Sequence, residues 1–101
     1  MPSRLELQTL LETLIGSRNV YFQPPPTLTL NYPCIVYSLD KVKTGFGDNK
    51  PYIHDKRYRV ISIDKNPDSA IPDKIAELPK CVFDRPYSAD NLNHNAYILY
   101  Y

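Results

Sequence analysis

Proline is the residue that most limits what this chain can fold into. Ten of the 101 residues are proline, including the run Pro24-Pro25-Pro26, and they recur along the whole chain. A proline has a fixed φ and no backbone N–H, so it breaks helices and cannot donate within the ladder of a sheet. The proline spacing therefore predicts short helices and strands joined by enforced turns, within one domain of residues 1–101.

Two segments have the periodicity of amphipathic helices. In residues 3–16 the leucines recur at the i, i+3, i+4, i+7 spacing of one helical face. Ser3 is the predicted N-cap of this helix, and Gly16 suits its C-terminal end. A second, shorter helix is predicted at about residues 69–78, with Pro72 in its first turn.

The remaining apolar segments predict strands. A short strand is expected at 20–23, an extended segment at 27–31, and further strands at 34–39, 58–64, 81–84 and 96–101. A start near Ile53 is the alternative for the strand at 58–64. Residues 87–93, rich in Ser, Asp and Asn, are expected to form a loop between the last two strands. The predicted fold class is α+β, a mixed and mainly antiparallel sheet of four to six strands with two helices, in the order α-β-β-β-α-β-β.

Apolar residues occupy both faces of the predicted strands, where one polar face would be usual for an antiparallel sheet. One reading is that the sheet is covered on both sides within the monomer. The other is that part of one tyrosine-rich face is left for a neighbouring subunit, because tyrosine combines an apolar ring with a polar tip. The candidate subunit-interface residues are Tyr37, Leu39, Tyr97, Leu99 and Tyr101.

A long polar connection, expected to be a mobile loop, is predicted at about residues 40–55. Residues 41–59 hold six basic residues against two acidic ones. Basic residues interleaved with aromatic ones can contact a phosphate backbone or an acidic protein surface, although a solvated hairpin tip has the same composition. The candidate partner-binding residues of this loop are Lys41, Lys43, Phe46, Lys50 and Tyr52.

The residues that build catalytic and metal sites form no recognisable motif in this sequence. The two histidines lack neighbours at metal-ligand spacing, and Cys34 and Cys81 lie in apolar runs and are expected to be reduced and buried. Four aspartates could hold Mg²⁺ in a nuclease-like domain, but turn and helix-start positions account for them without chemistry: Asp64, Asp68, Asp73 and Asp84. The sequence therefore predicts no enzyme, no cofactor and no metal, with a nuclease-like domain as the alternative.

Charge and hydropathy add expectations about the environment. The formal net charge of +1 favours neither nucleic acid nor a membrane as the main partner of the whole chain. A membrane span would need about 20 apolar residues, and the first residues lack the apolar core of a signal peptide. Synthesis and folding in a cytoplasm are expected.

Several segments together resemble small neck and tail proteins of long-tailed bacteriophages, usually described as tail-terminator, tail-completion or minor tail proteins. The similarity extends from about residue 4 to residue 101, and its clearest segments are residues 19–26 (NVYFQPPP), 32–37 (YPCIVY), 56–58, 68–75, 81–85 and 90–94. These motifs are structural and not catalytic.

The resemblance implies a structural virion protein without enzymatic activity or cofactor. Tail terminators form hexameric rings on the last ring of the tail tube, stop tube growth and present a surface to the head connector. The implied partners are other copies of the chain, the major tail tube protein, a head-completion or connector protein, and DNA passing through the lumen. A head-closure or neck adaptor and a small regulatory adaptor remain alternatives.

Overall fold

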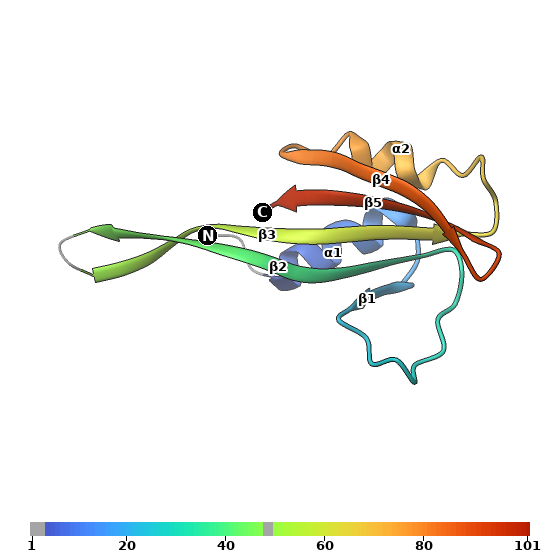
Figure 1. Cartoon of the computed structure of the whole chain (residues 1–101), viewed down its shortest axis with the longest axis horizontal. Helices are drawn as coiled ribbons and strands as arrows, with labels where there is room; N and C mark the ends of the chain where they lie inside the picture. Colours follow the sequence, from blue (N-terminus) through green and yellow to red (C-terminus); the bar gives the residue numbers. More distant parts are fainter. Residues whose placement is uncertain (1–3, 48–49) are drawn as a thin grey trace.

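The computed structural model describes residues 4–47 and 50–101, and the side chains of residues 4–42 and 56–101. Its elements are α1 (Arg4–Ile15), β1 (Val20–Phe22), β2 (Cys34–Gly47), β3 (Lys50–Asp64), α2 (Ile71–Ala76), β4 (Cys81–Ala89) and β5 (Leu92–Tyr100). The five strands form one sheet in the order β1-β2-β3-β5-β4, in which β1 is parallel to β2 and the other pairs are antiparallel (Figure 1). The predicted α+β class and element order are confirmed.

The first helix packs its leucine stripe onto the sheet. Leu7 and Leu11 are fully buried. The helix ends at Gly16, whose φ of 76° lies in the left-handed region and whose N–H donates to the carbonyl of Glu12 at 2.9 Å. That geometry is the expected glycine C-cap. The predicted N-cap, Ser3, lies outside the described residues.

The second helix is shorter than predicted. It comprises only Ile71–Ala76, with Pro72 in its first turn as expected. The Ser69 hydroxyl accepts a hydrogen bond from the N–H of Ile71 at 3.3 Å. The helix contributes one fully buried side chain, Ile75, to the core that α1 covers.

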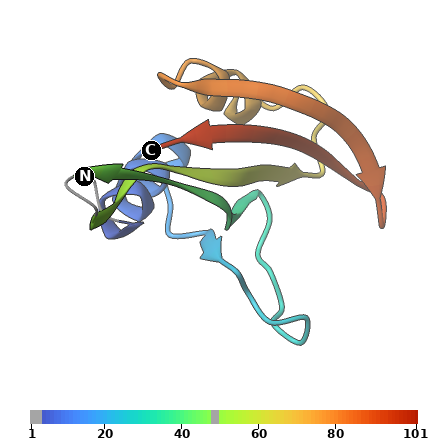
Figure 2. The same ribbon diagram turned by 60° about the vertical axis from the view of Figure 1, so that its left-hand side comes forward.

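Both helices lie on the same face of the sheet, and this placement overturns part of the predicted interface (Figures 1 and 2). Tyr37, Tyr97 and Leu99 are only 1%, 3% and 1% exposed, in one apolar cluster with Leu7, Leu11 and Ile75. The prediction that these three residues form a subunit interface is therefore wrong, because the helices of the same chain cover them. Tyr101 packs partly buried against the same cluster, and Leu39 is exposed.

The segment predicted as a loop at 40–55 forms strands. β2 continues to Gly47, β3 begins at Lys50, and the two strands pair along their length with a bulge at Asp40. β5 pairs with β3 only from Arg57 onwards, and β1 pairs with β2 only as far as Tyr37. Residues 41–47 and 50–56 therefore form a two-stranded arm that extends beyond the five-stranded sheet (Figure 1). The mobility of this arm stays a prediction.

The loop predicted at 87–93 is also mostly strand. β4 and β5 form a hairpin joined by Asp90 and Asn91, whose φ values of 52° and 61° are both left-handed. Two consecutive left-handed residues are what a tight type I′ hairpin turn requires. The extended segment predicted at 27–31 is not a strand.

Candidate interaction surface

The face of the sheet that points away from α1 and α2 is called the open face below. Among the described residues no helix packs on it, as both views of the fold show (Figures 1 and 2). Strand register places these residues on it: Val36, Ser38, Arg57, Arg59, Ile61, Val82, Ala96, Ile98 and Tyr100. It is the face opposite to the one on which the predicted interface residues Tyr37, Tyr97 and Leu99 lie.

At one end, the open face is covered by other residues of the same chain. Cys34, Ile63 and Leu92 form a second buried cluster there, and Leu30, from the segment after β1, packs against it. The hydroxyl of Tyr21 accepts a hydrogen bond from the N–H of Asn31 at 3.2 Å, which holds that segment in place. The accessible part of the open face is therefore its other end, towards the arm.

Ion pairs cross this accessible part. Arg57 contacts Asp40 at 2.6 Å, and Arg59 contacts Asp84 at 3.2 Å. A side-chain hydrogen bond with Tyr100, followed by the one with Asp40, raises the pKa of the Arg57 guanidinium above its usual value. Exposed pairs of this kind contribute little to stability.

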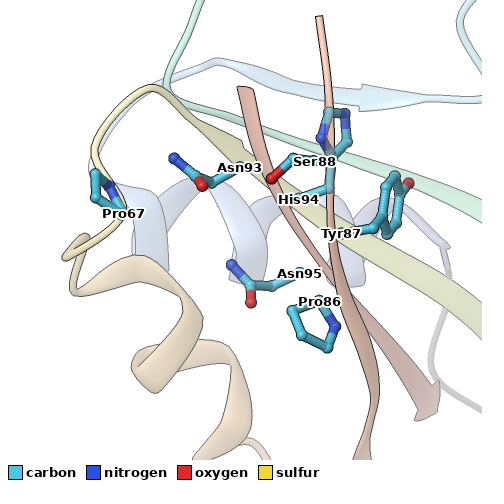
Figure 3. Close-up of a pocket in the computed structure, with 7 residues that line it drawn as sticks. All are labelled: Pro67, Pro86, Tyr87, Ser88, Asn93, His94 and Asn95. Atoms are coloured by element: carbon cyan, nitrogen blue, oxygen red, sulfur yellow. The ribbon is translucent and has the colours of Figure 1, made fainter. Parts of the chain in front are cut away.

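Three planar side chains lie close together near the turn between β4 and β5. The Tyr87 ring stacks on His94 with centroids 4.7 Å apart, and the Arg85 guanidinium lies 5.7 Å from the centre of the Tyr87 ring. Next to it is a shallow hollow of about 370 Å³ (Figure 3), lined by Pro67, Pro86, Tyr87, Ser88, Asn93, His94 and Asn95. Its amide and hydroxyl groups suit hydrogen bonding to a neutral polar group.

The two edges of the sheet are apolar and exposed. At one edge, all of β4 from Val82 to Ala89 is exposed; Val82 is 59% and Phe83 50% exposed. At the other edge, beyond the end of β1, Leu39 is 41% and Val42 36% exposed. Exposed strand edges with apolar side chains are ready to pair with another strand.

The predicted basic residues all belong to the arm. Lys41 is exposed on β2. Lys43 and Phe46 lie further along β2, and Lys50 and Tyr52 on β3, but their side chains lie outside the described ones. Val82, Phe83 and Asp84 were not among the predicted interface residues, although 81–84 was predicted as a strand. Their exposure follows from the position of β4 at the edge of the sheet, which no local signal in the sequence indicates.

The two cysteines are free and lie in different clusters. Burial, and to a smaller extent the charge of Asp64, raises the pKa of the Cys34 thiol to about 11. Burial also raises the pKa of the Cys81 thiol, which is partly buried against the core under the helices. Thiols with raised pKa values remain protonated near neutral pH, a state that is a poor nucleophile and a poor metal ligand.

The aspartates proposed for a nuclease serve separate local contacts. Asp64 accepts from the N–H of Asn66 at 2.9 Å, Asp73 lies in the first turn of α2, and Asp84 pairs with Arg59. Within the described part of the chain, no three His, Cys, Asp or Glu residues gather to hold a metal ion. None of the described helices has the length and apolar character to span a membrane.

Comparison of the chain with protein families, with curated proteins and with solved structures gives no match.

Proposed function

We propose that this chain is a structural protein of a phage virion. It assembles as a ring at the head-proximal end of the tail tube, ends tube growth and joins the tail to the head connector. The observation that carries the proposal is the pair of exposed strand edges on opposite sides of one sheet, β4 on one side and residues 39–42 of β2 on the other. Two different surfaces on opposite sides suit head-to-tail contacts, which form a ring when the rotation between copies closes and an open filament when it does not.

The resemblance of segments such as residues 19–26 and 32–37 to phage neck and tail proteins supports this choice of assembly. The expected partners are other copies of the chain, the tail tube protein and a head-completion or connector protein. The chain would be assembled in the host cytoplasm and remain in the virion.

A secondary contact with DNA in the lumen is favoured by one observation. Residues 41–59, which include the arm, contain six basic residues against two acidic ones, and Lys41 at the base of the arm is exposed. If the arm lines the lumen, its contact with DNA is electrostatic and weakens steeply with salt.

Deletion of the gene from its phage tests the proposed role. A terminator predicts tails of uncontrolled length that lack heads, and purified protein added back should cap tube ends as six-fold rings in negative-stain micrographs. A head-closure or neck adaptor predicts tails of normal length that fail to join heads. Normal virions without the gene, or metal-dependent cleavage of DNA by the purified chain, would overturn the proposal.

A further inference from the structure

The two exposed edges match each other in residue order. Along β4, Phe83, Asp84, Arg85 and Pro86 follow in sequence, and along β2 the order is Leu39, Asp40, Lys41 and Val42. Each segment therefore has an acidic and a basic residue between two apolar ones. All eight residues are exposed. Placed antiparallel, each apolar residue meets an apolar one and each charge meets its opposite.

The two bulges bring the charges of both edges to the same side of the sheet. Asp40 is the extra residue between Leu39 and Lys41, and its carboxylate pairs with Arg57 of the open face. Asp84 is the extra residue between Phe83 and Arg85, and it reaches Arg59 of that face. Because a bulge places two consecutive residues on one side of a strand, the basic neighbours Lys41 and Arg85 also lie on the open face.

Strand direction allows the same match in a continuous sheet. From β2 through β3 and β5 to β4, every neighbouring pair is antiparallel, so β4 runs opposite to β2. A second copy added at the β4 edge by rotation, with its open face on the same side, presents its β2 antiparallel to that β4. Antiparallel pairing gives the stronger hydrogen-bond geometry, and rotation generates a ring.

We propose that β4 of one copy pairs with β2 of the next copy in one register. Phe83 lies opposite Val42, Asp84 opposite Lys41, Arg85 opposite Asp40, and Pro86 opposite Leu39. The two edges alone support the pairing of β4 with β2. The closure of such pairs into a ring rests on the proposed function. The pairing ends at Pro86 and Leu39, because Pro86 has no N–H and the N–H of Leu39 already donates to the Gln23 side chain at 3.1 Å. Residues 87–89 of β4 must leave the neighbouring sheet there, since β1 pairs with β2 as far as Tyr37.

The competing arrangement is a two-fold pair of β4 strands. That pairing also sets Asp84 against Arg85 of the other copy, but it leaves Leu39 and Val42 exposed. Pairing β4 with β2 covers the exposed apolar residues of both edges, and for that reason it is preferred.

Charge reversal at the centre of the register separates the two arrangements. Lys41→Glu sets two acidic residues opposite each other, and Asp84→Lys sets two basic residues opposite each other. Each variant alone should associate about tenfold more weakly than wild type at low ionic strength, measured by sedimentation equilibrium. An equimolar mixture should recover wild-type association, because alternating copies restore an opposite charge pair at every contact.

Two control substitutions, and the mixture itself, show whether a loss of association comes from the charge contact or from misfolding. Lys65→Glu and Asp68→Lys reverse exposed charges between β3 and α2 and should leave association unchanged. Each variant is checked by circular dichroism, and a misfolded variant could not recover in the mixture.

The remaining outcomes overturn the pairing. A Lys41→Glu variant that associates like wild type while Asp84→Lys does not would establish the two-fold β4 pair. Wild-type protein that stays monomeric at every concentration, or two variants that both associate normally, would exclude the edge contact. If both variants still form rings on tail tubes, the proposed pairing is excluded and the proposed function stands. If mixing the two variants restores association but the protein does not bind tail tubes, the pairing stands and the proposed function is overturned.

Discussion

At the scale of single residues, the hydroxyl of Tyr37 ties the first helix to the sheet. It donates to the side-chain carbonyl of Gln8 at 2.5 Å and accepts from the guanidinium of Arg4 at 3.3 Å. The same Gln8 amide donates to the backbone carbonyl of Val20 at 2.9 Å, so α1, β1 and β2 meet at one polar contact under the helix. A buried hydroxyl at such a junction costs stability when it is removed, because its partners lose their hydrogen bonds.

Replacement of Tyr37 by phenylalanine tests that junction. The free energy of unfolding should fall by about 1–2 kcal/mol in urea denaturation, because the Gln8 carbonyl loses its donor in a partly buried place. Tyr87→Phe is the matched control, since the Tyr87 side chain is exposed, and it should change stability by less than about 0.5 kcal/mol. Equal effects of the two substitutions would contradict the junction.

Buried thiol and phenol groups make the stability sensitive to alkaline pH. Burial raises the pKa of Cys34 from 9.0 to about 11, with Asp64 as the smaller cause. Burial also raises the pKa values of Tyr37, Tyr58 and Tyr97 above 10.0. These groups hold their protons more tightly in the folded state. Their stabilising contribution is thus complete below the unfolded pKa and is lost as pH rises through the folded pKa.

The free energy of unfolding should therefore stay level up to about pH 9 and fall between pH 9 and 11. Cys34 alone should account for roughly 2 kcal/mol of that fall. Urea denaturation at intervals from pH 8 to 11 measures it. Cys34→Ala should flatten the curve more than Cys81→Ala, because the Cys34 thiol is buried and the Cys81 thiol is only partly buried. A wild-type curve that is level to pH 11 would contradict the expectation.

At the scale of elements, the turn of the β4–β5 hairpin has a strict backbone requirement. Asp90 and Asn91 have φ values of 52° and 61°, which glycine adopts freely and most other residues adopt at a cost. Asn91→Gly should raise the free energy of unfolding by up to about 1 kcal/mol, and Asn91→Ala should lower it by about 1 kcal/mol. The same glycine substitution at Ala89, inside β4, should lower it instead. Urea denaturation of the three variants decides the matter, and a destabilising Asn91→Gly would refute the turn geometry.

The segments that the sequence failed to predict as strands share a physical cause. A strand is recognised in a sequence from the alternation that burial of one face produces, but residues 85–89 of β4, beyond the strand predicted at 81–84, are all exposed. Residues 41–47 and 50–56 pair only with each other, so no core imposes a pattern on them. The bulges at Asp40 and Asp84 depend on pairing with a distant strand, and no local spacing indicates them.

At the scale of the whole molecule, the fold class and element order were predictable, whereas the covered face was not. Leucine periodicity and proline breaks are local signals, and they predict the helices and the breaks at residues 24–26, 32–33 and 79 correctly. Pro51 and Pro86, however, lie inside β3 and β4, where a loop and a strand end were predicted. In β2 and β5 both faces are apolar, so the sequence of the strands does not say which face the helices choose. That choice depends on how α1 and α2 connect to the sheet, and it moved Tyr37, Tyr97 and Leu99 from the predicted interface to the core.

Because the helices lie on one face of the sheet, α1 covers most of the core. Two leucines of α1 test that arrangement. Leu11 is fully buried against the sheet, whereas Leu5, on the outer side of the same helix, is 64% exposed. Leu11→Ala should lower the free energy of unfolding by about 2–4 kcal/mol, because it leaves a cavity between helix and sheet. Leu5→Ala, with the same chemical change and similar helix propensity, should alter it by less than about 0.5 kcal/mol. Thermal and urea denaturation compare the two variants. If they lose similar stability, α1 does not cover the sheet through its leucine stripe, and Tyr37, Tyr97 and Leu99 would again be candidates for a surface that binds a partner.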